Sequence, residues 1–191
     1  CIRDSASTER QLDQALAQGL APPLAVIAAH QRHGYGQAGR QWVSPRGGVW
    51  LSAALPWAQP TADAPLASPA LAVTLGLVLQ LEALGLQPAI KWPNDLLLQG
   101  RKLAGVLPRL RWRGGQLLGA RVGVGLNLCN RVPPGAIALA DQPLHLGLER
   151  GTALVLRALE WAVAASAQPE LVRRQAERRL WRDGSVVVSG L

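Results

Sequence analysis

The sequence contains no methionine and only two cysteines, Cys1 and Cys129. Two cysteines supply neither a disulfide framework nor the spacing of a metal site, which argues against a disulfide-rich secreted domain. No basic and apolar leader of the signal-peptide type begins the sequence, so we expect a cytoplasmic protein. Because methionine is missing, we also expect that the initiator was removed or that the true start lies upstream of Cys1.

Long apolar runs are missing as well. Even the Leu/Ala-rich stretch over 66–86 is interrupted before it reaches the roughly 18 apolar residues of a membrane span. The chain has 191 residues, of which 49% are hydrophobic, and this composition allows an ordinary core. We therefore expect a soluble protein built around one domain, without a membrane segment.

Lysine is scarce: of the 20 Lys and Arg residues only Lys91 and Lys102 are lysine. An ammonium at these two positions is either a chemical requirement or what a compositional bias has left. The formal net charge of +8 would attract phosphate. The arginines are spread along the chain, however, and the few aromatic residues do not alternate with them as a nucleic-acid stacking platform requires. The charge suits a nucleotide-binding enzyme equally well.

Hydrophobic periodicity predicts helices beside strand hairpins, which is typical of an α+β layer fold with a mostly antiparallel sheet. The first helix should begin at a capping box formed by Thr8 and Gln11 and end at Pro22. The second should begin at Ser68, present one apolar face and stop at Gly85. Two more helices are predicted over 152–165 and 169–181.

Strands are predicted over 24–29, 49–55 and 88–92, followed by hairpins that turn at 99–100 and 113–115 and a strand over 116–128. Residues 30–48 are polar, contain glycine and lack a period, which predicts a long functional loop. An extended run begins at 184–189, at the end of the chain.

The predicted loop contains Gly34, Gly36 and Gly39 and ends with Arg40 and Trp42. Backbone N–H groups between glycines can converge on an anion, and Arg40 can offer a planar fork to phosphate or carboxylate. A flexible surface loop is the alternative. Although the glycines match G-x-G-x-x-G, they lead to a strand and not into a helix, so a dinucleotide-binding fingerprint is excluded.

A second segment reads Lys91-Trp92-Pro93-Asn94-Asp95. Pro93 sets a turn after a strand, so the Lys91 ammonium should leave the edge of the sheet in a fixed direction; an ordinary surface charge is the alternative. A third segment places Gly123 and Gly125 on one face of a strand, which indicates close approach of a ligand or of a second protein layer.

In this order the three segments resemble the catalytic domain of the biotin-protein ligase family. The patterns are Q-x-x-G-x-G-x-x-G-R-x-W-x-S-P over 31–45, K-W-P-N-D with an N-G-R-K-x-x-G-like continuation over 91–105, and G-x-G-x-N over 123–127. The resemblance implies an α+β fold shared with class II aminoacyl-tRNA synthetases, with helices packed on one face of a mostly antiparallel sheet. It implies a catalytic domain over 1–183, with 184–191 as the start of a truncated or missing C-terminal β domain.

The resemblance also implies an ATP-dependent enzyme that forms biotinyl-5'-AMP and transfers biotin to a lysine of the biotin carboxyl carrier protein of acetyl-CoA carboxylase. ATP and Mg²⁺ would take part, with no metal bound by the protein itself. Lys91 and Arg40 would be catalytic. Biotin would be bound by Ser7, Thr8, Gln31, Gly34, Tyr35, Trp42, Lys91, Gly105, Gly123 and Gly125, and the nucleotide by Gln37, Arg40, Trp42, Lys91, Asn94 and Asn127. No helix-turn-helix for DNA is expected, and the oligomeric state, including a homodimer, is left open.

Four positions depart from the family pattern. Tyr35 and Gln37 replace two arginines of the glycine loop, which predicts weaker retention of the adenylate or compensation by Arg32 or Arg46. Glu9 stands where asparagine is usual and Arg109 where an acidic residue is common. A lipoate ligase on the same fold, which would not be expected to carry the 91–95 run, and a non-catalytic binder of biotin, nucleotide or nucleic acid are the competing hypotheses.

Overall fold

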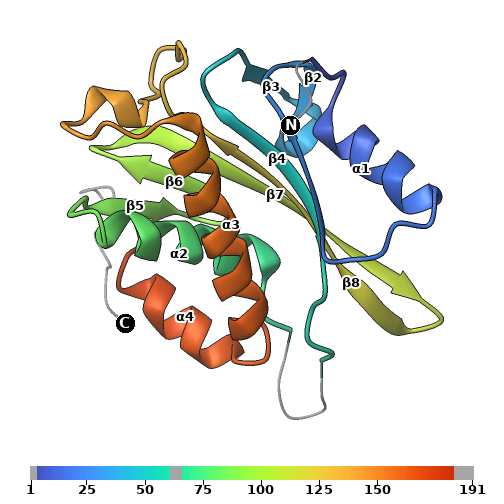
Figure 1. Cartoon of the computed structure of the whole chain (residues 1–191). Coiled ribbons are helices and arrows are strands. Elements are labelled where there is room, and N and C mark those ends of the chain that lie inside the picture. The colour runs from blue at the N-terminus through green and yellow to red at the C-terminus, as the bar shows by residue number, and fades with distance from the viewer. Residues whose placement is uncertain (1–3, 61–65, 183–191) are drawn as a thin grey trace.

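A six-stranded sheet forms the centre of this computed structural model, which describes residues 4–60 and 66–182 (Figure 1). Its strand order is β1-β4-β8-β7-β6-β5, and all neighbours are antiparallel. The strands are β1 (Leu24–Ala28), β4 (Val49–Leu55), β5 (Pro88–Lys91), β6 (Asp95–Leu98), β7 (Arg101–Arg113) and β8 (Gln116–Leu126). The predicted α+β class and antiparallel sheet are confirmed.

Helices α2 (Pro69–Glu82), α3 (Leu148–Ala165) and α4 (Pro169–Glu177) form a layer on one face of the sheet (Figure 1). Helix α1 (Thr8–Ala17) packs against β1 and β4 on the opposite face, where Thr8 Oγ1 lies 2.8 Å from Ser52 Oγ. The expectation that all helices pack on one face therefore holds for α2, α3 and α4 and is wrong for α1. No helix within the described residues is long and apolar enough to cross a membrane.

Helix α2 is the centre of the core. It begins as predicted, with Ser68 as N-cap and Pro69 in the first turn. Nearly all of its residues are buried, however, so the prediction of a single apolar face is wrong. The reason is its position between two layers, since it contacts the sheet on one side and α3 and α4 on the other. A helix that is apolar all round is typical of such a buried position.

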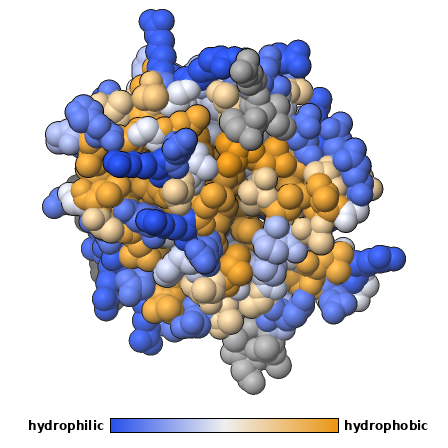
Figure 2. Space-filling model, viewed as in Figure 1, coloured by the Kyte–Doolittle hydropathy of each residue, from blue (hydrophilic) through white to orange (hydrophobic). Residues whose placement is uncertain are grey.

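The helix layer leaves some leucines at the surface, among them Leu156 of α3 and Leu171 of α4. On this side of the molecule apolar residues gather toward the centre and hydrophilic residues surround them (Figure 2). Single exposed leucines are normal on protein surfaces.

The hairpin turns lie where they were predicted. Gln99 and Gly100 connect β6 to β7 with φ angles of 52° and 71°, and this positive pair is what a tight hairpin requires. Gly114 and Gly115 connect β7 to β8 in the same way. Helix α1 begins at Ser7, whose hydroxyl accepts from the Glu9 N–H, so the predicted capping box at Thr8 is wrong.

Residues 30–48 are not a long loop. They form a small hairpin of β2 (Gln31–Tyr35), a 3₁₀ turn (Gln37–Gly39) and β3 (Gln41–Ser44). Gly34 faces Trp42 across it, and a Cβ at Gly34 would lie 2.4 Å from the Trp42 carbonyl oxygen. The strands are short and mostly exposed, so the hydrophobic alternation that would have predicted them is absent.

Helix α4 ends at Glu177, earlier than the predicted 181, because the chain turns to the edge of the sheet. The Ile90 N–H donates to the Arg179 carbonyl at 2.7 Å, and the Trp181 N–H donates to the Ile90 carbonyl at 2.8 Å. Helix α3 begins at Leu148, four residues before the predicted start at 152. The predicted extended run over 184–189 lies outside the described residues.

Candidate functional site

Three strands present two rows of residues, half of them glycine, on the face that α1 covers. Trp50, Gly125 and Gly105 are paired across β4, β8 and β7, and the neighbouring row joins Ser52, Gly123 and Leu107. Residues that pair across antiparallel strands point to the same side of a sheet. The two rows therefore form a shallow floor, and its glycines leave space above the sheet because they have no side chain.

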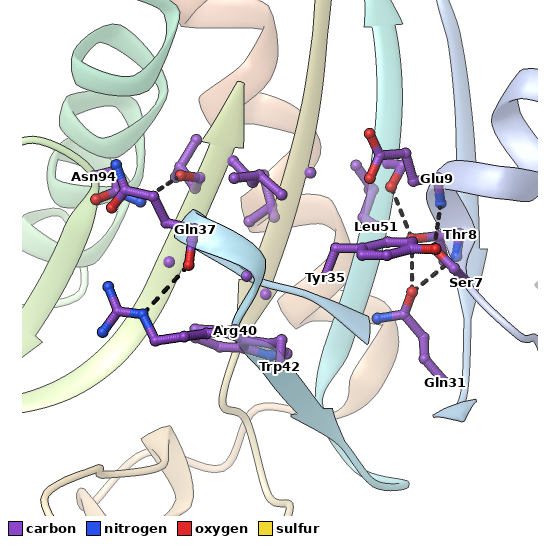
Figure 3. Close-up of a pocket in the computed structure, with 18 of the residues that line it drawn as sticks. Ser7, Thr8, Glu9, Gln31, Tyr35, Gln37, Arg40, Trp42, Leu51 and Asn94 are labelled. Carbon is purple, nitrogen blue, oxygen red and sulfur yellow. Dashed lines mark hydrogen bonds between the residues drawn. The ribbon is translucent and has the colours of Figure 1, made fainter. Parts of the chain in front are cut away.

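A cavity of about 200 Å³ lies on this floor, between the first turn of α1 and the β2–β3 hairpin (Figure 3). It is lined by residues from α1, both sheets and the β5–β6 turn: Ser7, Thr8, Glu9, Gln31, Tyr35, Gly36, Gln37, Arg40, Gln41, Trp42, Leu51, Ser52, Asn94, Asp95, Lys102, Gly105, Val106, Leu107, Gly123, Val124 and Gly125. Figure 3 shows Ser7, Thr8, Glu9 and Gln31 at one end and Asn94, Gln37 and Arg40 at the other.

Hydroxyl and amide groups form the first of these ends. Gln31 Oε1 accepts from the Thr8 N–H at 2.8 Å and from its hydroxyl at 2.9 Å. Gln31 Nε2 donates to Ser44 Oγ at 2.9 Å, and the Thr8 hydroxyl also contacts Ser52. This end is therefore a polar wall whose members hold one another in place.

Trp42 lies across the middle of the floor. A Cβ on Gly125 would lie 2.6 Å from the indole ring, and one on Gly105 would lie 2.9 Å from it. These two glycines therefore make room for a protein side chain, which was one of the two readings of the glycine pattern. Gly123 is different, since its added Cβ would meet only ordinary contacts at 3.7 Å or more. Trp42 Nε1 is buried without a hydrogen-bond partner among the described residues.

Lys102 provides an ammonium at the second end. Its Nζ lies 2.6 Å from Asp95 Oδ1 and 4.9 Å from the centre of the Trp42 ring. Leu96 pairs with Ala104 and Leu97 with Lys102, which leaves Leu103 as an extra residue, a β-bulge. The bulge reverses the alternation of β7, so that Lys102 points to the same face as Gly105.

Most of the residues predicted for the site line this cavity. They are Ser7, Thr8, Gln31, Tyr35, Trp42, Gly105, Gly123 and Gly125 of the biotin set, and Gln37, Arg40, Trp42 and Asn94 of the nucleotide set. Arg40 donates from Nε to the Gln37 carbonyl at 3.3 Å, and Asn94 Nδ2 donates to the Val106 carbonyl at 2.9 Å. The hairpin and the β5–β6 turn thus bring these side chains together.

Lys91, Gly34 and Asn127 do not line the cavity. Lys91 is exposed at the end of β5 and pairs with Asp95, one strand beyond the cavity. Gly34 is buried inside the β2–β3 hairpin. Asn127 is 5% exposed, and its Nδ2 donates to the Lys102 carbonyl at 3.4 Å, which places it behind the backbone of that lysine.

Several lining residues were not predicted. Lys102 had been noted for the scarcity of lysine and as part of the pattern over 91–105, but no role was assigned to it. Asp95 belonged to the motif at 91–95, and Ser52 gave no signal in the sequence. Glu9 was noted only as a departure from the family pattern, and its Oε1 lies 3.0 Å from Nη1 of Arg109, the other unusual residue. Within residues 4–60 and 66–182 no three His, Cys, Asp or Glu side chains are grouped closely enough to hold a metal ion.

Comparison with known proteins gives one family. The model of the biotin/lipoate A/B protein ligase family matches residues 2–127. The bifunctional ligase/repressor BirA of Escherichia coli is 34% identical over 157 residues, which are 77% of this chain and 48% of that protein. A biotin acetyl-CoA-carboxylase ligase of Paracoccus denitrificans is 37% identical, over 73% of this chain and 59% of its own length. The chain thus spans about half the length of these relatives.

Solved structures share the fold. A biotin acetyl coenzyme A carboxylase synthetase from Helicobacter pylori with bound biotinylated ATP is 28% identical, with a TM-score of 0.60 over 84% of this chain and 72% of that one. The biotin protein ligase of Leishmania major in complex with biotinyl-5-AMP has a TM-score of 0.76 at 19% identity, covering 100% of this chain and 85% of that one. The second likeness concerns the fold alone.

Proposed function

The chain belongs to the biotin/lipoate A/B protein ligase family, and from this premise we propose that it acts as an ATP-dependent biotin-protein ligase. The relatives of that name, from Paracoccus denitrificans among others, support the reaction class. The substrate, cofactor and partner assignments below are parts of the same proposal.

One observation carries the proposal: the cavity is polar at one end and cationic at the other. Arg40 lies at the end opposite the wall of Ser7, Thr8 and Gln31 (Figure 3). Lys102 belongs to that same end, because its ammonium contacts Asp95, the neighbour of Asn94 in the sequence. Biotin has the matching form, since a ureido ring with hydrogen-bonding groups is separated from a carboxylate by an alkyl chain. We orient the ureido ring toward the wall and the carboxylate toward Lys102, with the alkyl chain beside Trp42.

In the first step a biotin carboxylate oxygen forms a bond to the α-phosphorus of ATP while the bond from that phosphorus to pyrophosphate breaks. Two anions must approach each other, which is electrostatically uphill. Fixed cations offset this best in a site that excludes water. Lys102 is placed to do so because its ammonium is held between Asp95 and the Trp42 ring. Mg²⁺ enters with the phosphates, as Mg·ATP, which fits a metal that usually binds through one or two carboxylates plus phosphate.

Lys102 therefore takes, in this proposal, the role that the sequence had assigned to Lys91. The two lysines are eleven residues apart, and only Lys102 lines the cavity. Lys91 ends the row of paired residues that includes Gly105 and Asp95, so it remains available to the outer part of a bound nucleotide.

In the second step a lysine amine of the carrier attacks the acyl carbon of biotinyl-5'-AMP, an amide bond forms, and AMP leaves with the electron pair of the acyl-oxygen bond. We propose the biotin carboxyl carrier protein of acetyl-CoA carboxylase as carrier, because the Paracoccus denitrificans relative is named for that enzyme. We propose the cytoplasm as the location, since ATP is a substrate there.

The test is to incubate the protein with Mg·ATP, labelled biotin and a biotin carboxyl carrier domain, and to measure pyrophosphate and carrier-bound label. We expect both, with neither when ATP is omitted. Parallel reactions with lipoate and a lipoyl domain provide the contrast. Label on the lipoyl domain alone would favour a lipoate ligase, and binding of biotin without pyrophosphate release would favour a non-catalytic binder; either result contradicts the proposal.

A further inference from the structure

Two unusual residues, 100 positions apart in the sequence, meet at the rim of the cavity. Glu9, on the first turn of α1, lines the cavity, and its side chain is 18% exposed. Arg109 of β7 lies outside it, 60% exposed, with Nη1 at 3.0 Å from Glu9 Oε1. Arg109 pairs with Arg121 in the row next to Leu107 and Gly123, so the sheet directs its side chain to the face that carries the cavity floor.

Glu9 differs from its neighbours in hydrogen-bonding capacity. The other polar groups of the wall are largely bonded to one another, because Gln31 binds Thr8 and Ser44 while Ser52 binds Thr8. A carboxylate has about four acceptor sites and no donor when ionised. Oε1 faces Arg109, and no hydrogen bond from a described residue reaches Oε2. Glu9 is therefore the strongest acceptor that this end of the cavity can still offer to a ligand.

We propose that Glu9 is a specificity-determining residue, whose carboxylate accepts an N–H of the ligand, and that Arg109 is a positioning residue that orients this carboxylate. The inference rests on the function proposed above and extends it to the choice of ligand. The ligand class is a carboxylic acid whose opposite end carries an N–H donor, such as a cyclic urea.

The charges of the cavity support this choice. Figure 3 shows Glu9 at the end opposite Arg40, so an acid held by its carboxylate at the cationic end presents its other end to Glu9. A cyclic urea offers N–H groups there and gains a charge-assisted hydrogen bond, which is stronger than a neutral one. A dithiolane ring offers none and would leave the Glu9 carboxylate partly desolvated without compensation, which disfavours its binding. The pair of Glu9 and Arg109 thus favours biotin over lipoate, the two ligands in the description of the family.

The test is calorimetric titration of the wild type and Glu9→Gln with biotin, desthiobiotin, ureido-N-methylated biotins and lipoate. Glutamine keeps the shape and a weaker acceptor but removes the charge. We expect Glu9→Gln to weaken biotin and desthiobiotin about tenfold, because a charge-assisted hydrogen bond is lost. Its affinity for lipoate, and for the analogue methylated at the nitrogen that faces Glu9, should rise, because the carboxylate that these ligands desolvate without compensation is gone.

Arg109→Gln tests positioning. It should reduce the preference for biotin over the methylated analogue while leaving the thermal midpoint near that of wild type. A merely structural role would instead lower the midpoint and weaken all ligands equally. Glu149→Gln, which removes the same charge from an exposed position on α3, is the matched control and should change no affinity.

The outcomes separate the two proposals. If wild type binds biotin and Glu9→Gln affects all ligands equally or none, the role of Glu9 is overturned while the ligase proposal stands. If wild type binds no biotin, the ligase proposal fails and the role of Glu9 fails with it.

Discussion

At the scale of single residues, Lys102 and Lys91 offer a direct comparison, since both are lysines on neighbouring parts of the sheet and only one lines the cavity. Lys102→Ala should reduce biotinyl-5'-AMP formation by about 10²–10³-fold, the usual effect of losing one preorganised charge-stabilising group. Lys91→Ala should retain most of the activity. Pyrophosphate release under single-turnover conditions measures both variants.

Circular dichroism of both lysine variants provides the folding control. If Lys102→Ala were as active as wild type, the Lys102 ammonium would have no part in the mechanism. Loss of adenylate formation in Lys91→Ala alone would return the role to the position that the sequence first suggested.

Gly125 and Gly123 form a second matched pair. A Cβ at Gly125 would lie 2.6 Å from the Trp42 indole, so Gly125→Ala should destabilise the fold by about 1–3 kcal/mol, as overpacking does. Gly123→Ala meets contacts of 3.7 Å or more and should leave stability near wild type. It should still weaken biotin binding, because its methyl group enters the space beside Ser52. Urea unfolding and calorimetry distinguish the two, and similar stabilities for both variants would contradict this account of the floor.

The choice between the lysines shows the limit of sequence reasoning at this scale. A regular strand would place Lys102 on the same face as Ala104, in the core, and only the extra residue Leu103 turns it to the cavity. No local signal in the sequence announces that bulge, since its residues are ordinary strand formers. The residue types of the site could be predicted, because glycines, a lone ammonium and polar side chains each leave a recognisable pattern.

At the scale of elements, the β2–β3 hairpin carries two of the four departures from the family pattern, Tyr35 and Gln37. Tyr35 connects the hairpin to α1, since its hydroxyl accepts a hydrogen bond from Arg10 Nε at 2.9 Å. Arg32 and Arg46, expected to compensate for the lost arginines, are exposed and do not line the cavity. Among residues 4–60 and 66–182, Arg40 is therefore the one arginine that lines the cavity.

Gln37→Arg tests whether the adenylate is held weakly when Arg40 is the arginine that lines the cavity. A second guanidinium in the turn can form a charge-assisted bond to phosphate, so the rate of biotinyl-5'-AMP release should fall about tenfold. The measurement is a pulse-chase of radiolabelled adenylate from the purified complex. Gln116→Arg, at an exposed position at the start of β8 that does not line the cavity, provides a control for added charge. An unchanged or faster release from Gln37→Arg would contradict the predicted role of this position.

Elements were predicted best where the pattern was long or the turn chemistry was distinctive. The hairpin at Gln99 and Gly100 followed from its turn residues, and α2 began at the predicted Ser68. The β2–β3 hairpin was missed because its strands are exposed and too short to show alternation. The burial of nearly all of α2 was missed because it depends on α3, which packs against it from a distant part of the sequence.

At the scale of the whole molecule, the α+β class followed from the mixture of elements, but the strand order did not. Strand β1 pairs with β4, and β4 with β8, across long intervals of sequence that no local pattern specifies. The position of the cavity depends on that order, since its floor combines β4, β8 and β7. The family resemblance implied which distant residues meet around a ligand, but it gave no strand order.

The last described residues lie along the β5 edge of the sheet, where an ion pair joins the end of α2 to the segment that follows α4. Arg179 donates from Nε to Glu82 Oε1 at 2.7 Å and from Nη2 to Oε2 at 2.9 Å. Hydrogen bonding to Glu82 raises the pKa of the Arg179 guanidinium, so the arginine stays protonated. The same segment supplies the hydrogen bonds between Ile90 and residues 179–181.

Glu82→Gln should therefore destabilise the protein by about 1 kcal/mol, the upper range for a partly exposed pair, with a smaller difference in high salt. Hydrogen exchange should locate the effect. The amides of Ile90 and Trp181 should exchange faster than in wild type, because both hydrogen bonds join β5 to the segment that Arg179 holds: the Ile90 N–H donates to the Arg179 carbonyl, and the Trp181 N–H donates to the Ile90 carbonyl. Glu160→Gln, an exposed change on α3, should alter neither. If Glu82→Gln lowered global stability but left these two amides protected, the pair would stabilise the fold without holding residues 179–181 against β5. Another interaction would then have to hold that segment at the edge strand.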